Sequence, residues 1–299
     1  MEHKTLIEVL NGLLTRYKER VPDVAGIIDA MIAEGVINNF EEIENDHVAF
    51  RTLGVPHLGI ASLEKIFLAY GYEKKSPYHF SEKKLDAYWY APPSPEFPRI
   101  FISELIVTAL SERAQRLIHK YTDAITADPV DALDLNNGAA VDLFLHSPLW
   151  ETPTVEDYTE LMAESEYAAW TIYNRYYLNH FTISIHNLKE GYNNLEAFDR
   201  FLLKHGFKLN DAGGEIKTSS DGALLQSSTV AELVEATFAE GKKKVIAGSY
   251  VEFAERKVLP EFAGIPAAEL NNTHRREGFE AGNADKIFES TFLSQTSKK

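Results

Sequence analysis

The clearest pattern in the chain is a strict alternation of apolar and polar residues in two stretches, residues 46–52 and 179–186. Successive side chains of a β-strand point to opposite faces, so the alternation predicts two strands that each bury one face. The polar faces carry His47, Ala49 and Arg51 in the first strand and His180, Thr182, Ser184 and His186 in the second. One polar face usually meets water, so neither strand alone indicates a site.

A similar order of elements follows each of these strands. A predicted helix comes next and ends near a glycine, Gly71 in the first half and Gly206 in the second. The helix sequences LEKIFLAYGY and FDRFLLKHGF resemble each other, and further strands follow both. We interpret this as an internal repeat of a strand–helix–strands unit, with modules over about residues 46–104 and 179–256.

The repeat predicts an α+β fold in which two βαβββ modules form one curved mixed sheet around a cavity. Added helices are expected at the N-terminus and in an insert over about residues 105–178, where residues 155–177 have the spacing of one helix. A helix is expected over residues 230–238 and one last strand over 245–256. We expect residues 1–299 to form a single domain, with residues 258–292 packed over one end of the cavity.

Two modules packed side by side would bring His47, His180 and Glu252 together. Glu252 lies on the last predicted strand of the second module and shares a face with Arg256. Two neutral imidazoles and one carboxylate, with the other positions open, are the ligand set of non-haem Fe(II) oxygenases. We therefore predict a metal site at His47, His180 and Glu252, with Fe(II) as its cofactor.

Composition narrows the possible chemistry. The chain has 30 Lys and Arg against 45 Asp and Glu, a net charge of −15, which argues against binding to nucleic acid. It has no cysteine, so disulfides, thiolate nucleophiles and cysteine-ligated metals are excluded. The sequence shows neither an apolar run of membrane-spanning length nor a charged-then-apolar signal pattern at the N-terminus. We expect a cytoplasmic protein that does not bind membranes.

Five motifs, in order DHVAFRTL, NHFTISIH, LLQSST, GSYVEFAER and IFEST, resemble the DUF1338 family of 2-oxoadipate dioxygenase/decarboxylases. The resemblance covers nearly the whole chain. This family is related to the vicinal oxygen chelate superfamily, whose βαβββ modules agree with the repeat. The resemblance implies metal ligands at His47, His180 and Glu252, and the conversion of 2-oxoadipate and O₂ to 2-hydroxyglutarate and CO₂ in lysine catabolism.

The resemblance also implies that Arg51 grips the substrate, a small-molecule 2-oxo acid. Arg51 is four residues from His47 on the same face, roughly 13 Å along a strand that rises ~3.3 Å per residue. Its long side chain could reach back to the distal carboxylate of a six-carbon diacid. Gln226 and Thr182 are further candidates for binding the substrate, whereas Arg256 could clamp a carboxylate or pair with an acid. The sequence predicts no oligomeric state.

Two alternatives remain open. Each half ends with a strand that carries an acid, so Glu104 is the expected counterpart of Glu252, and a His–Glu–His–Glu site would suit a glyoxalase-like, metal-dependent isomerase or lyase. We favour Glu104 outside the ligand set, because the resemblance assigns only three ligands. The other alternative is a non-catalytic small-molecule-binding protein on the same fold, in which the three ligands need not converge.

Overall fold

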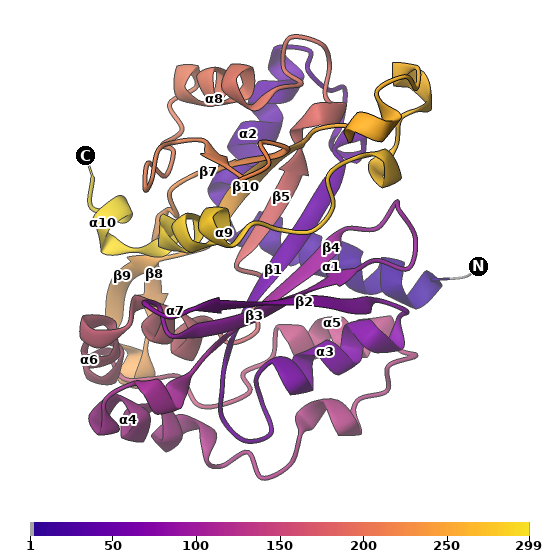
Figure 1. The fold of residues 1–299 in the computed structure, drawn as a ribbon. Helices are drawn as coiled ribbons and strands as arrows, with labels where there is room; N and C mark the ends of the chain where they lie inside the picture. The colour runs from indigo at the N-terminus through magenta and orange to yellow at the C-terminus, as the bar shows by residue number, and fades with distance from the viewer. Residues whose placement is uncertain (1–2, 299) are drawn as a thin grey trace.

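One curved, eight-stranded sheet organises the computed structural model, which describes residues 3–298 (Figure 1). Its strands, in chain order, are β1 (Asn45–Leu53), β2 (Glu73–Phe80), β3 (Leu85–Ala91), β4 (Arg99–Leu105), β5 (His180–Ser184), β6 (Lys217–Thr218), β7 (Leu224–Ser228) and β10 (Tyr250–Arg256). They lie in the order β2-β3-β4-β1-β5-β10-β7-β6. The predicted curved mixed sheet is confirmed.

The two halves of this sheet repeat one another. β1 is parallel to β4, β5 is parallel to β10, and the halves join where β1 and β5 run antiparallel at the centre of the sheet (Figure 1). In each half, the first strand carries a histidine opposite the first residue of the last strand: His47 faces Arg99, and His180 faces Tyr250. Equivalent positions in the halves can therefore be read directly from the strand register.

Helices cover one face of the sheet and leave the other for the histidines. α3 (Ile60–Ala69) packs on the first half, where the rings of Phe50 and Phe67 lie 5.5 Å apart. α8 (Leu195–Lys204) packs on the second half, where the rings of Phe253 and Phe198 lie 5.2 Å apart. Because neighbouring residues of a strand alternate, His47 and Glu252 point to the opposite face.

The remaining elements surround this sheet. They are α1 (Lys4–Arg20), α2 (Pro22–Ala33), α4 (Glu112–Thr122), α5 (Gly138–Leu145), α6 (Val155–Glu164), α7 (Glu166–Asn174), α9 (Ala281–Ile287), η9 (Phe288–Thr291) and α10 (Leu293–Thr296), with β8 (Leu233–Thr237) and β9 (Lys243–Ala247) as a separate two-stranded sheet. α9 crosses in front of the main sheet and contacts β2, β6 and β7 (Figure 1). In residues 3–298, no helix combines the length and apolar character needed to cross a lipid bilayer.

Three local expectations are wrong. Residues 233–237 form strand β8 instead of a helix, because the short apolar spacing there fits either structure. The expected last strand is divided into β9 and β10 at residues 248–249. The helix expected over 155–177 is two helices, since the Ser165 side chain caps the start of α7 by accepting from the backbone N–H of Ala168 at 3.1 Å. That residues 1–299 form a single domain stays a prediction.

Candidate metal centre

The structure brings His47, His180 and Glu252 together at the centre of the sheet. The Nε2 atoms of His47 and His180 are 3.3 Å apart, and the Glu252 carboxylate oxygens lie 3.4 Å and 3.0 Å from them. All three side chains are buried. Within the described part of the chain, no other group of three His, Cys, Asp or Glu residues brings its donor atoms this close.

This geometry fits a metal ion. Two ligand atoms at right angles, each about 2.1 Å from a metal, are about 3.0 Å apart. The 3.3 Å between the two Nε2 atoms and the 3.0 Å between His180 Nε2 and Glu252 Oε2 are close to that value, and the second carboxylate oxygen, Oε1, lies 3.4 Å from His47 Nε2. Two imidazoles and one carboxylate placed in this way can occupy one face of an octahedron. Two imidazoles and a carboxylate, with no thiolate, suit iron or a similar divalent ion.

The charges of Glu252 and His180 also fit a metal ion. Burial would raise the pKa of Glu252, but the two neighbouring histidines hold it well below its usual range, so the carboxylate is ionised. Burial lowers the pKa of His180, which favours the neutral imidazole that a metal binds. Burial lowers the pKa of His47 too, but the carboxylates of Glu252 and Asp46 raise it overall, so a metal ion that binds His47 would displace a proton.

A phenylalanine occupies the position where a fourth ligand would be expected from the repeat. His180 pairs with Tyr250, and Glu252 lies two residues further along β10; His47 pairs with Arg99, and Phe101 lies two residues further along β4. Phe101, not Glu104, is therefore the counterpart of Glu252, and its ring lines the cavity beside the three ligands. The expected equivalence of Glu104 and Glu252 is wrong.

Glu104 lies on the other face of the sheet and has a different use. It pairs with Thr52, which is adjacent to Arg51 on β1 and therefore points to the face opposite His47 and Arg51. Its carboxylate accepts a hydrogen bond of 2.7 Å from the backbone N–H of Ile60, at the start of α3. Gly59, with φ of 80°, leaves room for it, since a Cβ there would overlap the carboxylate. Glu104 thus satisfies the N-terminus of α3.

Comparison with known proteins decides the family. The family model for 2-oxoadipate dioxygenase/decarboxylase matches residues 9–266. The chain belongs to this family. The resemblance seen in the sequence motifs is therefore confirmed.

Two relatives support membership of the 2-oxoadipate dioxygenase/decarboxylase family. A 2-oxoadipate dioxygenase/decarboxylase, chloroplastic, of Arabidopsis thaliana is 43% identical over 305 residues, which cover 97% of this chain and 78% of the relative. The crystal structure of the hydroxyglutarate synthase of Oryza sativa, in complex with 2-oxoadipate, superposes with a TM-score of 0.87 at 42% identity, covering 97% of this chain and 93% of that one.

A third relative extends the likeness in fold alone. A putative glyoxalase superfamily protein from Ralstonia eutropha JMP134 superposes with a TM-score of 0.69 at 21% identity, covering 90% of this chain and 84% of that one. Its glyoxalase-like fold agrees with the predicted βαβββ modules.

The expected cytoplasmic location is contradicted by these relatives. The Arabidopsis protein is chloroplastic by name, and a relative from Oryza sativa is chloroplastic or amyloplastic by name. The cytoplasmic expectation rested on two missing features, an apolar run of membrane-spanning length and a signal pattern near the N-terminus, and neither is positive evidence for the cytoplasm.

Arg51 lies close to the metal centre without lining its cavity. The side chain is 1% exposed; its guanidinium donates to the Thr291 hydroxyl at 2.9 Å and to the backbone carbonyl of Phe288 at 3.0 Å. The rings of Tyr167 and Trp170 lie 5.0 and 5.1 Å from it. Its Nε atom is buried without a hydrogen-bond partner, which leaves one donor for an anion.

Gln226 and Thr182, the other candidates for substrate binding, contact the ligands themselves. Gln226 donates to Glu252 Oε1 at 2.7 Å and in turn accepts from Asn283 of α9 at 3.0 Å. The Thr182 hydroxyl lies 3.1 Å from His47 Nε2. Both side chains are buried; the Gln226 contact orients Glu252, whereas the Thr182 hydroxyl lies at the nitrogen of His47 that would bind the metal. A role in substrate binding stays a prediction for each.

Asp46, which was not among the residues predicted for the site, lies directly behind His47. Its carboxylate is 2.8 Å from His47 Nδ1 and takes two hydrogen bonds from Arg256, at 2.6 and 2.9 Å. Burial alone would raise the pKa of Asp46, but the charges of Arg256 and Arg99 hold it well below the usual range. The one signal in the sequence was its position immediately before a ligand histidine.

The cavity beside the metal ligands is small and mostly apolar. Its lining residues are His47, Phe101, His180, Gln226, Glu252, Phe279, Ala284, Ile287 and Phe288, around a volume of about 20 Å³. That is room for about one water molecule. Residues 279–288 belong to the C-terminal region that the sequence predicted over the cavity.

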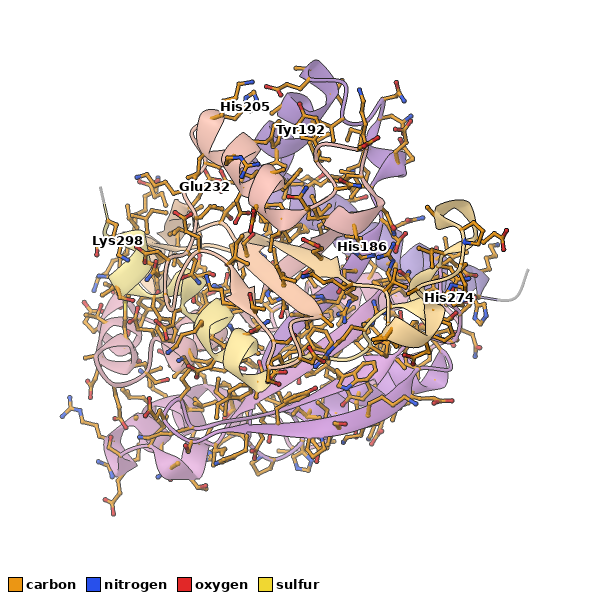
Figure 2. The ribbon with its side chains drawn as sticks, turned by 45° about the horizontal axis from the view of Figure 1, so that its top comes forward. His186, Tyr192, His205, Glu232, His274 and Lys298 are labelled. Carbon is orange, nitrogen blue, oxygen red and sulfur yellow. The ribbon has the colours of Figure 1, made fainter. Side chains whose placement is uncertain are left out.

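Three histidines outside the metal centre each have a hydrogen-bond or ion-pair partner at one ring nitrogen. Figure 2 marks His186, His205 and His274, which lie outside the metal centre. His205 pairs with Glu34 at 2.8 Å, His274 Nδ1 accepts from the backbone N–H of Asn271, and His186 Nδ1 accepts from that of Arg256. Burial lowers the pKa of His186 to about 4, so it stays neutral.

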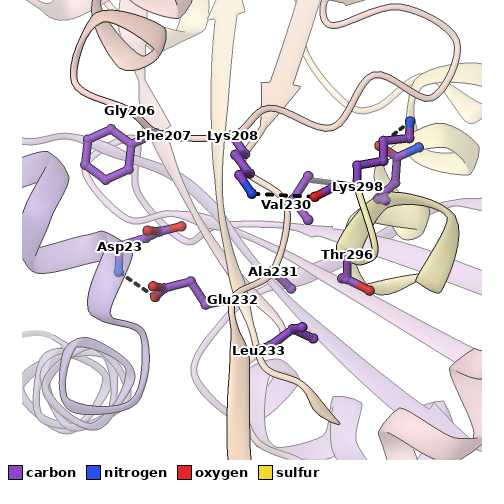
Figure 3. Close-up of a pocket in the computed structure, with 11 residues that line it drawn as sticks. Asp23, Gly206, Phe207, Lys208, Val230, Ala231, Glu232, Leu233, Thr296 and Lys298 are labelled. Atoms are coloured by element: carbon purple, nitrogen blue, oxygen red, sulfur yellow. Dashed lines mark hydrogen bonds between the residues drawn. The ribbon is translucent and has the colours of Figure 1, made fainter. Parts of the chain in front are cut away.

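A second, wider cavity lies between α2 and the loop before β8 (Figure 3). Its volume is about 310 Å³, and its walls carry Asp23 and Glu232 on one side and Lys208 and Lys298 on the other. The backbone N–H of Asp23 donates to Glu232 at 3.0 Å, so Glu232 caps the start of α2. Asp23 and Glu232 give the cavity two carboxylates, and among the residues that the structure describes they are not part of a group of three that could hold a metal ion.

Proposed function

We propose that the protein is an Fe(II)-dependent enzyme that converts 2-oxoadipate and O₂ to 2-hydroxyglutarate and CO₂, within lysine catabolism. The observation that carries the proposal is a ligand set of two histidines and one carboxylate whose fourth corner holds Phe101. Three protein ligands leave three octahedral positions, enough for a chelating 2-oxo acid and dioxygen. The name of the Arabidopsis relative and the 2-oxoadipate complex of the rice protein support the choice of substrate.

His47, His180 and Glu252 would hold the metal, which supplies the one-electron chemistry that dioxygen needs. Overall, the bond between the two oxidised carbons of 2-oxoadipate breaks and releases CO₂. One oxygen atom completes a carboxylate at the former keto carbon, and the other becomes the hydroxyl on the adjacent carbon. Atoms and electrons balance without a further reductant.

The protein's own part is binding, orientation and exclusion of water. Arg51 would receive the distal carboxylate through its Nε donor, which is buried without a partner; because Arg51 does not line the small cavity, this contact requires residues 279–288 to shift. The rings of Phe101, Phe279 and Phe288 keep the surroundings of the metal apolar. The ligands come from both modules, His47 from the first and the other two from the second, so we also propose that the modules act as one domain.

The test is an anaerobic titration with Fe(II) and 2-oxoadipate, followed by exposure to ¹⁸O₂. We expect hydroxyglutarate that carries both labelled oxygen atoms, with one unlabelled CO₂ for each O₂ consumed. The matched control is His180→Ala, which we expect to lose metal binding and turnover together. An isomerised product without O₂ uptake, or activity with Ni(II) and none with Fe(II), would favour the glyoxalase-like alternative.

A further inference from the structure

The residue before each ligand histidine differs between the two halves of the sheet. Asp46 precedes His47, and Asn179 precedes His180 at the equivalent position. Each contacts Nδ1 of its histidine, Asp46 at 2.8 Å and Asn179 at 3.2 Å. The first ligand is therefore backed by a charged carboxylate and the second by a neutral amide.

An irregularity in β1 brings Asp46 onto this side of the strand. Asn45 pairs with Ile183 and His47 pairs with Thr182, so two steps along β1 correspond to one step along β5. Asp46 is the additional residue of a β-bulge, and bulges redirect side chains that regular alternation would point to the other face. A bulge beside a functional site is a specific feature, because it interrupts the ladder at that point.

Two arginines hold Asp46 in place and also fasten the segment that covers the site. Arg256 donates to both Asp46 oxygens and to the backbone carbonyls of Arg276 and Gly278, at 2.9 and 2.7 Å. Arg99 lies 3.5 Å from Asp46 and donates to Glu277. The next residues carry Phe279, whose ring meets that of His47 edge-on at 4.7 Å.

We propose that Asp46 is a positioning residue that keeps the proton of His47 on Nδ1 and aims Nε2 at the metal, which makes His47 the more strongly donating of the two histidine ligands. A carboxylate behind a ligand imidazole fixes its tautomer and raises its basicity, and its loss costs 10- to 100-fold in metal affinity in other proteins. The neutral Asn179 would orient the ring of His180 in the same way but would raise the basicity of its imidazole less. This inference rests on the proposed metal function.

The chain itself supplies a conservative test. Asp46→Asn makes the first half like the second, where an asparagine already precedes the histidine. We expect the affinity for Co(II), measured by equilibrium titration, to fall about 10- to 100-fold and the visible absorption bands of bound Co(II) to shift. The matched control is Glu277→Gln, which removes a charge from the same arginine network without touching His47.

Glu277→Gln should bind Co(II) like the wild type. Equal losses of Co(II) affinity in both variants would mean that Asp46 acts only through the arginines. Wild-type Co(II) affinity and absorption bands in Asp46→Asn would mean that Asp46 is only a counter-ion of the arginines. Either result overturns the inference. If Asp46→Asn does not fold, ¹⁵N-histidine spectra of the Zn(II)-loaded wild type decide: we expect a proton on His47 Nδ1, and a bare Nδ1 overturns the inference. Failure of the wild type to bind metal would instead refute the proposed function.

Discussion

Arg51 is a buried cation whose surroundings are mostly aromatic. Its guanidinium has the Thr291 hydroxyl and the Phe288 carbonyl as partners, and its Nε has none. An arginine without a carboxylate partner at such depth is unusual, because burial of an unpaired charge is costly. A dianionic substrate would provide the missing charge.

Arg51→Ala should weaken turnover of the diacid more than it weakens metal binding. A lost hydrogen bond to a charged group corresponds to about 1.5–3 kcal/mol, so kcat/KM should fall about 10- to 100-fold. Steady-state kinetics with 2-oxoadipate, beside a Co(II) titration, measure the two effects. Arg51→Lys keeps the charge but loses the planar guanidinium, so its kcat/KM should lie between those of the wild type and Arg51→Ala. Equal losses of turnover and metal affinity in Arg51→Ala would contradict the role.

At the scale of elements, the register of four central strands decides which side chains reach the metal. β4 and β10 occupy equivalent places, yet β10 presents Glu252 where β4 presents Phe101. The near-symmetry therefore produces three ligands and one apolar corner. Glu104 lies an odd number of residues after Phe101 on β4. Its side chain therefore points to the opposite face of the sheet, which α3 covers.

Glu104→Ala should lower stability and leave metal affinity unchanged. Loss of the carboxylate at the start of α3 removes a partner of the Ile60 N–H, which corresponds to about 0.5–2 kcal/mol for helix caps. Urea denaturation and a Co(II) titration measure the two quantities. A fall in metal affinity with unchanged stability would instead support the four-ligand alternative.

Phe101→Glu should convert the site to four ligands. The metal-free variant should be less stable than the wild type, because the new carboxylate is buried beside Phe279 and Phe288 without a partner. Ni(II) should then raise its Tm by more than it raises the wild type's, while 2-oxoadipate turnover is lost for want of open positions. Phe101→Leu is the control and should retain turnover. A Ni(II) effect no larger than the wild type's would refute the equivalence of Phe101 and Glu252.

At the scale of the whole molecule, contacts between distant parts of the chain close the structure around the sheet. The C-terminal segment returns over the first module, where the ring of Phe279 packs against that of Phe101 at a tilt of 51°, with ring centres 5.0 Å apart. On the other side, α2 near the N-terminus meets Glu232 just before β8. There, burial and the nearby Glu232 charge raise the pKa of Asp23 to about 7.

Asp23 should make the protein less stable as the pH rises from about 4 to about 7. In this range the folded state retains a proton on Asp23 that the unfolded state, with a pKa of 3.8, has lost. Because the unfolded state binds fewer protons, stability falls with rising pH. Asp23→Asn should therefore raise the Tm at pH 8, with a gain that shrinks towards pH 4. Glu232→Gln, which removes the neighbouring charge, should reduce the same pH dependence; a pH-independent gain for Asp23→Asn would contradict the assignment.

The sequence by itself determined the local features. Alternation settled which side chains share a strand face, so His47 and Arg51 were assigned together and the repeated histidine was found. The order of elements gave two modules, and five motifs gave the family, which the comparison confirms. These features depend only on short segments and on their order along the chain. Both can be read from the sequence without knowing the fold.

The alignment of distant segments, in contrast, is visible only in the folded protein. Strand register depends on hydrogen bonds between segments that are distant in the sequence, such as β1 with β4 and β5 with β10, so the sequence predicted Glu104 as the counterpart of Glu252 where the sheet has Phe101. The bulge that turns Asp46 towards His47 exists only opposite β5. Gln226 could be assigned to Glu252 only once β7 lay beside β10. Local pattern fixes the face of a side chain, whereas long-range pairing fixes its neighbours.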